Sequence, residues 1–265
     1  MSRRRSGWRG NRVVATERLL RALASTIVRS GPKATSWDRE SLPEGDDKVR
    51  AVRDMFDAIA PRYDLVNRIM TFRLDVRWRR RAVRALELAH GSRVLDLASG
   101  TGDMCIDLTR GGHQPISVDM SHGMLAADRS GAPRVQADIL RLPVRDRSVD
   151  GVTCGFALRN LVELPAFFSE LGRVVRAGGR IALLDVGIPR NPIVRWGNGI
   201  YFGKVVPRIG ALLSDAAAYR YLPRSVAYLP PPEVMVASLR LAGFADASHH
   251  QLSGGITQLL IGTRE

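Results

Sequence analysis

Cysteine is scarce in this chain, and residues spaced to hold a metal ion are missing. The 265 residues include two cysteines, Cys105 and Cys154, too few for a disulfide framework and typical of a reducing compartment. None of the five histidines stands at a metal-ligand spacing from cysteine or from acidic residues. We therefore expect neither disulfides nor a metal.

Long apolar runs are missing as well. No run reaches the roughly 18 to 20 residues that a membrane-spanning helix needs. The most apolar stretch, residues 193–213, is broken by Arg195, Lys204, Pro207 and Arg208. No apolar core with a small-residue cleavage site follows the N-terminal arginines, as a secretory signal would require. We expect a cytoplasmic protein, with room only for peripheral contact at the inner face of the membrane.

Lysine is rare, so arginine carries nearly all of the positive charge. Only three of the 40 basic residues are lysines, and the formal net charge is +14. Residues 1–33 hold nine basic side chains and one acid, a charge of +8. Such a basic tail is typical of segments that bind nucleic acid or an anionic membrane surface. The alternative is that it has no specific partner. An organellar transit peptide is a weaker alternative. We expect residues 1–45 to be a disordered extension and 46–265 to be the folded domain.

From residue 92 onward, short apolar runs alternate with helical segments. Strands separated by helices predict a parallel sheet, and Ser253-Gly254-Gly255 predicts a hairpin between the last two strands. The fold class is therefore α/β, with a mostly parallel sheet, a C-terminal antiparallel hairpin and N-terminal helices within 46–88. The predicted strands are 93–98, 115–119, 134–137, 149–155, 180–186, 245–252 and 256–263, with helices at 103–110, around 124 and at 165–175.

A glycine-rich turn, residues 96–102 (DLASGTG), follows the first predicted strand. Gly100 and Gly102 allow a sharp turn close to a ligand, and the next helix offers free N–H groups at its positive end. Asp96 either contacts the ligand or only orients this turn through backbone bonds.

Two further acids follow neighbouring strands. Asp119, beside Met120, ends the second strand, where a carboxylate can accept bonds from both ribose hydroxyls. Asp138, beside Ile139, follows the third strand and is placed either to bind an adenine amino group or to cap a helix. The order D-x-x-x-G-x-G and this third acid favour a methyl donor over a nicotinamide dinucleotide.

Four segments resemble the ubiquinone/menaquinone biosynthesis C-methyltransferase family (UbiE/MenG type) of class I methyltransferases. The resemblance covers about 47–264 and implies a Rossmann-like class I methyltransferase fold, with S-adenosylmethionine (SAM) as cofactor. The turn is common to many methyltransferases, whereas Tyr63-Asp64…Asn67, Leu158-Arg159-Asn160 and Tyr219-Arg220-Tyr221-Leu222 are more specific. The segments are 56–67 (FDAIAPRYDLVN), 96–103 (DLASGTGD), 155–160 (GFALRN) and 206–225.

Matched residue by residue, the resemblance places cofactor contacts on Thr101, Asp119, Asp138 with Ile139, and Gly155. Gly155 departs from the pattern, because a serine is common there and glycine keeps only backbone contact. Ser99 stands where Gly or Cys is frequent, and Asp185 where Glu is usual. The full set expected to bind the cofactor is Asp96, Gly100, Thr101, Gly102, Asp119, Met120, Asp138, Ile139 and Gly155.

The acceptor that the resemblance implies is a ring carbon of a prenylated quinol. Such a carbon becomes nucleophilic when a neighbouring hydroxyl loses its proton, so the site must stabilise an oxyanion. Our hypothesis is that Arg159 supports this oxyanion, Asn160 orients the ring and Tyr63 closes over the cofactor. Arg159 can instead form a salt bridge that holds a lid, and Tyr63 can simply pack. Residues 187–231, rich in aromatics and proline, are predicted to cap the cleft and accept the prenyl tail, or to cover the domain.

The favoured reaction is SAM-dependent methylation of demethylmenaquinol to menaquinol. A ubiquinone precursor, an RNA acceptor, a noncatalytic SAM-binding subunit of a quinone-synthesis complex and, last, a nicotinamide oxidoreductase remain as alternatives. We expect no specific nucleic acid partner. A homodimer or a quinone-synthesis complex is compatible with the sequence.

Overall fold

The computed structural model describes residues 45–60, 63–201, 203, 206 and 225–265. The expected N-terminal extension, the Tyr219–Leu222 motif and most of the predicted cap beyond residue 201 lie outside the described residues.

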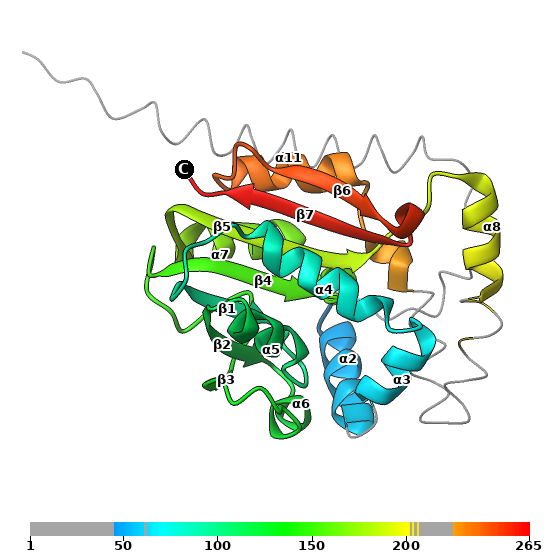
Figure 1. The fold of residues 1–265 in the computed structure, drawn as a ribbon, viewed down its shortest axis with the longest axis horizontal. Helices are drawn as coiled ribbons and strands as arrows, with labels where there is room; N and C mark the ends of the chain where they lie inside the picture. Colours follow the sequence, from blue (N-terminus) through cyan, green and yellow to red (C-terminus); the bar gives the residue numbers. More distant parts are fainter. Residues whose placement is uncertain (1–44, 61–62, 202, 204–205, 207–224) are drawn as a thin grey trace, which may run out of the picture. The chain divides into compact units, whose positions relative to one another are not determined.

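A seven-stranded sheet forms the centre of the described domain (Figure 1), in the order β3-β2-β1-β4-β5-β7-β6. The first five strands pair in parallel, and β7 runs antiparallel to both β5 and β6. The predicted α/β fold with its C-terminal antiparallel pair is confirmed. The strands are β1 (Arg93–Leu97), β2 (Gln114–Asp119), β3 (Arg134–Gln136), β4 (Val149–Gly155), β5 (Val175–Val186), β6 (Ser248–Leu252) and β7 (Thr257–Thr263).

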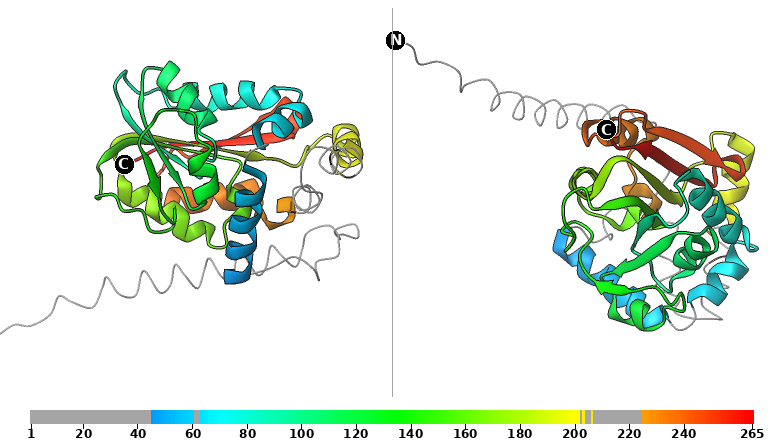
Figure 2. Two further views of the ribbon diagram at one scale, coloured as in Figure 1. Left: turned by 90° about the horizontal axis from the view of Figure 1, so that it is seen from below. Right: turned by 60° about the vertical axis from the view of Figure 1, so that its left-hand side comes forward.

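Helices cover both faces of this sheet (Figure 2). α4 and α5 lie on one face, whereas α7 and α11 lie on the other. The helices are α2 (Gly45–Ile59), α3 (Tyr63–Met70), α4 (Leu74–Ala85), α5 (Asp103–Arg110), α6 (His122–Ala126), α7 (Leu164–Val174), α8 (Pro192–Ile200) and α11 (Pro232–Leu241), with short 3-10 turns η3 (Leu158–Asn160), η5 (Val226–Tyr228) and η6 (Ser253–Gly255).

The apolar residues divide into three buried clusters. Phe167 and Phe168 of α7 anchor one face of the sheet, and Trp78 of α4 anchors the opposite face. A third cluster, which includes Val66 and Met124, packs α2, α3 and α6 together beside the glycine-rich turn. This third cluster is what holds the N-terminal helices against the carboxyl end of the strands.

The start of β5 differs from the prediction of a turn at Gly178-Gly179. Val175 already pairs with Val149, and the register then shifts so that Arg180 pairs with Gly151. Four residues of β5 therefore stand opposite one residue of β4, and Gly178 takes a positive φ of 74° within this irregularity. The glycines mark a bulge in a longer strand rather than the strand's beginning.

None of the helices in the described ranges is long and apolar enough to cross a lipid bilayer.

Candidate functional site

The glycine-rich turn between β1 and α5 has a left-handed backbone at three positions. Ala98, Gly100 and Gly102 have φ angles of 51°, 57° and 83°. Gly102 occupies the N-cap position of α5, and a Cβ there would come within 2.3 Å of Oδ1 of Asp128. Glycine is therefore required at this position by both backbone angle and space. The turn directs the N–H groups of the first turn of α5 toward the carboxyl end of the sheet.

Asp119 is a buried carboxylate that backbone amides hold in place. The N–H of Gly100 donates to Oδ2 (2.9 Å), and the N–H of Ser121 donates to Oδ1 (2.8 Å). Burial raises the pKa of Asp119, and these two amides partly oppose the rise. Each oxygen accepts one of these bonds and has a second lone pair, so the group can still accept two donors.

Asp138 lies at the end of the neighbouring strand but is exposed. Its Oδ1 accepts from the N–H of Leu140 (2.9 Å), while Ile139 between them is buried. The expected capping bond is present, although it begins a turn rather than a helix. Asp119 pairs with Gln136 in the sheet, so both acids stand at the same sheet edge.

Asp96 lies beneath the turn and bonds to other strands and helices. Thr153 Oγ1 donates to Oδ1 of Asp96 (2.9 Å), and Cys105 Sγ lies 3.4 Å from Oδ2. Burial raises the pKa of Asp96 to about 7. The carboxyl thus ties β1 to β4 and α5 through two side-chain donors, whereas the orienting alternative expected bonds to the backbone of the turn. Burial also raises the pKa of the thiols of Cys105 and Cys154, so neither is a reactive thiolate.

Two aspartates of the N-terminal helices reach the glycine-rich turn and the segment after β2. Asp64 accepts from Thr101 Oγ1 (2.5 Å) and forms an ion pair with Arg129. Asp57 accepts from Ser121 Oγ (2.5 Å) and from the N–H of Gly123. Sequence reasoning missed both roles, although both acids stand in the segment 56–67 that carried the resemblance.

Arg159 lies in a buried ion pair at the ends of β4 and β5. Its Nη1 donates to Oδ1 of Asp185 (2.5 Å) and to the carbonyl of Phe156 (2.6 Å), and its Nε donates to Ser225 Oγ (3.1 Å). Arg159 therefore forms a salt bridge, but its partner Asp185 belongs to β5 and not to the predicted cap. Arg159 also lies close enough to Tyr63 that its positive charge partly opposes the rise that burial causes in the tyrosine's pKa.

The predicted catalytic residues come from two parts of the chain. Asn160 is half-buried in η3, directly after Arg159. Tyr63 begins α3 and packs edge-on against Phe56, with ring centroids 5.8 Å apart. The structure thus places Tyr63 within electrostatic range of Arg159.

Lys48 of α2 is a third residue that sequence reasoning missed. Its side chain is buried, and Nζ donates to the carbonyls of Arg159 and Leu161 (3.2 Å each). The ammonium also lies 3.5 Å from the centre of the Tyr228 ring. A lone lysine in an amphipathic helix gave no signal for this role, because lysine is usually solvent-exposed.

Gly155, which departs from the family pattern, ends β4 close to α5. A Cβ at this position would lie 3.2 Å from Cε of Met104 on α5. A serine would need Met104 to shift, so glycine and methionine fit together here. Ser99, a second departure from the pattern, has its hydroxyl 2.7 Å from that of Ser117.

Within the described residues, no group of three or more His, Cys, Asp or Glu side chains is arranged to hold a metal ion.

The family model described as "ubiE/COQ5 methyltransferase family" matches residues 44–264. The chain is 38% identical over 230 residues to the "Ubiquinone/menaquinone biosynthesis C-methyltransferase UbiE" of Geobacter sulfurreducens, covering 82% of this chain and 90% of that protein. It is 39% identical over 241 residues to the "Demethylmenaquinone methyltransferase" of Deinococcus radiodurans, covering 87% and 99%. Its fold is similar to that of a SAM-dependent methyltransferase from Archaeoglobus fulgidus, with a TM-score of 0.56 and 16% identity over 76% of this chain and 99% of the other.

Proposed function

Because this chain belongs to the ubiE/COQ5 methyltransferase family and is a SAM-dependent methyltransferase of quinone biosynthesis, we propose that it methylates a ring carbon of demethylmenaquinol. The Deinococcus relative carries this substrate in its name. A ubiquinone precursor is the second candidate, since the Geobacter relative is named for both quinones.

The single observation that best supports the cofactor site is Asp119 with its two amide donors. A ribose diol needs a carboxylate that is held rigidly and keeps free lone pairs, and Asp119 meets both conditions. Asp138 stands at the same edge for the adenine amino group, and the turn at Gly100 to Gly102 approaches the amino acid part of the cofactor through its backbone. Asp96, Thr101, Met120, Ile139 and Gly155 complete the proposed set.

SAM supplies an electrophilic methyl group on a sulfonium, and the protein must align an acceptor carbon with it. In our proposal, the quinol hydroxyl gives up its proton to water, and Arg159 stabilises the negative charge left on the oxygen. Asp185 fixes the guanidinium for this purpose through the 2.5 Å ion pair. The ring carbon that receives the methyl group then releases its own proton to water, which restores the aromatic ring, and S-adenosylhomocysteine is the other product. Asn160 orients the ring, and Tyr63 closes the site from α3.

The test is incubation of the full chain with labelled SAM and a short-chain demethylmenaquinol, followed by mass measurement of the product. A product heavier by one methyl group on the ring carbon supports the proposal. A matched assay with a ubiquinone precursor decides between the two substrates. SAM affinity without turnover on either quinol would identify a noncatalytic subunit instead, and turnover only on RNA would contradict the quinol assignment.

Association with the membrane, with a second copy or with a quinone-synthesis complex remains a proposal. A quinol with a prenyl tail is held in the bilayer, so a water-soluble domain must meet it at the membrane surface.

A further inference from the structure

Helix α8 presents an apolar stripe to solvent. None of its nine residues is buried. Ile193, Trp196 and Ile200 share one face of the helix, and Ile193 and Trp196 are 79% and 72% exposed. A single exposed apolar side chain needs no explanation, but a helix with no buried side chain and an aligned apolar stripe indicates a contact surface.

A second apolar stripe runs along α3 and into the turn after it, beside α8. Leu65, Ile69 and Phe72 are all exposed, and Phe72 is 74% exposed. The end of α8 contacts this stripe, because Tyr201 donates to the carbonyl of Met70 (2.8 Å) and its ring centre lies 5.8 Å from that of Phe72. The two stripes are therefore neighbours on one side of the domain.

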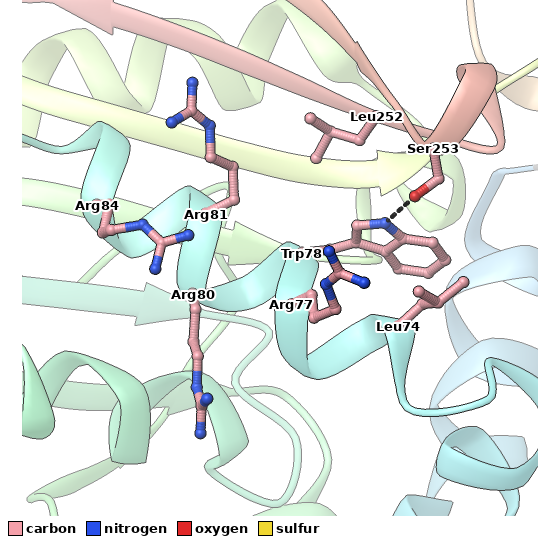
Figure 3. Close-up of a pocket in the computed structure, with 8 residues that line it drawn as sticks. All are labelled: Leu74, Arg77, Trp78, Arg80, Arg81, Arg84, Leu252 and Ser253. Atoms are coloured by element: carbon pink, nitrogen blue, oxygen red, sulfur yellow. Dashed lines mark hydrogen bonds between the residues drawn. The ribbon is translucent and has the colours of Figure 1, made fainter.

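A groove of about 450 Å³ on α4 is lined by arginines (Figure 3). Arg77, Arg80, Arg81 and Arg84 line it, and no carboxylate does. Arg80 contacts Asp107 at 3.4 Å, whereas Arg77, Arg81 and Arg84 form no ion pair with any residue that the structure describes. Residues 65–84 carry seven arginines and one aspartate, a formal charge of +6.

The arginine groove is continuous with α8 through η6. Trp78 of α4 donates to Ser253 Oγ (2.8 Å), which closes one side of the groove (Figure 3). The next residue, Gly254, packs on α8, since a Cβ there would lie 3.7 Å from Val194. Arginines and exposed apolar stripes thus occupy adjoining parts of one surface, which we name the α3/α4/α8 face.

We propose that the α3/α4/α8 face docks on an anionic phospholipid bilayer, with the α4 arginines on headgroup phosphates and the stripes of α3 and α8 in the interface. The negative charge of headgroup phosphates complements the positive charge of the groove, which is lined by four arginines and no acidic residue. Transfer of aliphatic side chains such as Ile193 and Leu65 into the acyl boundary lowers the free energy. Trp196 is a residue type that favours the polar side of the membrane–water interface.

Other occupants fit this surface less well. Nucleic acid would use the arginines and could stack on Trp196 or Phe72, but it offers no place for the aliphatic majority of the two stripes, because its stacking partners are aromatic rings and guanidinium groups. A second copy in a two-fold dimer would bring the same patch against itself, so each arginine groove would meet either the other groove or the apolar stripes, and neither supplies the negative charge that the arginines need. A bilayer satisfies both the charge and the apolar area. The proposed quinol substrate gives this docking a biological reason, but the evidence for the docking face comes from the exposed side chains alone.

The experiment is co-sedimentation of the full chain with vesicles of phosphatidylcholine alone and of phosphatidylcholine with 30% phosphatidylglycerol. Arg77→Glu with Arg81→Glu is expected to reduce binding to the anionic vesicles at least tenfold. The matched control is Arg145→Glu with Arg147→Glu, the same charge change on exposed residues of the loop before β4, with an expected change below twofold. Ile193→Ser with Trp196→Ser is expected to reduce binding at least fivefold.

Two outcomes would overturn the proposal. One is wild-type binding by the Arg77/Arg81 variant, which would assign vesicle binding to the N-terminal arginines or another surface. The other is failure of the wild type to bind anionic vesicles while a single-stranded oligonucleotide binds and depends on Arg77 and Arg81. If the glutamate variant does not fold by circular dichroism, Arg77→Gln with Arg81→Gln replaces it, with an expected loss of at least threefold.

Activity separates this inference from the proposed function. The Arg77/Arg81 variant should methylate a short-tailed quinol in detergent at the wild-type rate and lose activity on quinol held in anionic vesicles. A wild type that binds vesicles but methylates no quinol would contradict the proposed function and leave the docking face intact.

Discussion

Arg159 and Asp185 form an ion pair that is almost completely closed to solvent. Their side chains are 4% and 0% exposed, and Nη1 lies 2.5 Å from Oδ1. The main-chain N–H of Arg159 donates to the other carboxylate oxygen (3.0 Å), so η3 and the end of β5 are joined twice. The desolvation of both charges offsets much of their attraction, but removing one charge leaves the other buried without compensation.

We expect Asp185→Asn to lower the free energy of unfolding by about 3 to 5 kcal/mol, because it strands the Arg159 charge in the interior. Urea unfolding followed by tryptophan fluorescence measures this. Asp54→Asn, which breaks the exposed pair with Arg53, is the matched control and should change stability by less than about 0.5 kcal/mol. Equal losses in the two variants would contradict the importance of burial.

Arg159→Lys should reduce kcat for quinol methylation at least tenfold while the Kd for SAM changes less than threefold. Lysine keeps the positive charge but cannot reproduce the forked geometry that reaches Asp185, Phe156 and Ser225 together. Steady-state kinetics and isothermal titration calorimetry separate the two effects. Turnover within a few-fold of wild type would assign Arg159 a purely structural role.

Asp119→Asn should weaken SAM binding by about 10- to 100-fold, since hydrogen bonds to a charged group contribute about 1.5 to 3 kcal/mol. The new amide nitrogen would also face the N–H of either Gly100 or Ser121. Asp138→Asn is the comparison and should cost less than Asp119→Asn, because this side chain is exposed and keeps its bond from Leu140. Calorimetry measures both, and the reverse order would contradict the proposed site.

The sequence predicted the sheet well because strand and helix periodicities are local signals. β4 and α5 match their predicted bounds, and the hairpin signal at Ser253–Gly255 correctly joined β6 and β7. The bulge at Gly178 was missed because a glycine pair looks the same whether it begins a strand or interrupts one. Contacts over long sequence distances were missed too: Asp64 with Thr101 and Lys48 with the carbonyl of Arg159 join segments whose approach depends on packing of the third cluster.

The contribution of Asp96 to the free energy of unfolding should fall as the pH rises from about 4 to about 7. Burial raises its pKa from 3.8 to about 7, so the folded state binds a proton that the unfolded state releases. The stabilising contribution is complete below the unfolded pKa and is lost as pH rises through the folded value. Asp96→Asn removes this dependence, so the stability of the wild type minus that of the variant should fall by a few kcal/mol from pH 4 to pH 8. Urea titrations at four pH values measure it, and a constant difference would contradict the buried neutral carboxyl.

Lys48→Met should raise KM for the quinol and lower Tm, with less effect on the Kd for SAM. Methionine fills much of the same volume but cannot donate to the carbonyls of Arg159 and Leu161, so α2 loses its polar attachment to η3. Two buried carbonyls that lose this donor cost about 1 to 3 kcal/mol each unless water replaces the ammonium.

The matched control is Arg53→Met on the same helix, which removes an equal charge from an exposed position. Kinetics and thermal unfolding test both variants. If Lys48→Met and Arg53→Met behave alike, α2 is held by its apolar face alone, and the contact between Lys48 and the loop after β4 does not position the substrate site.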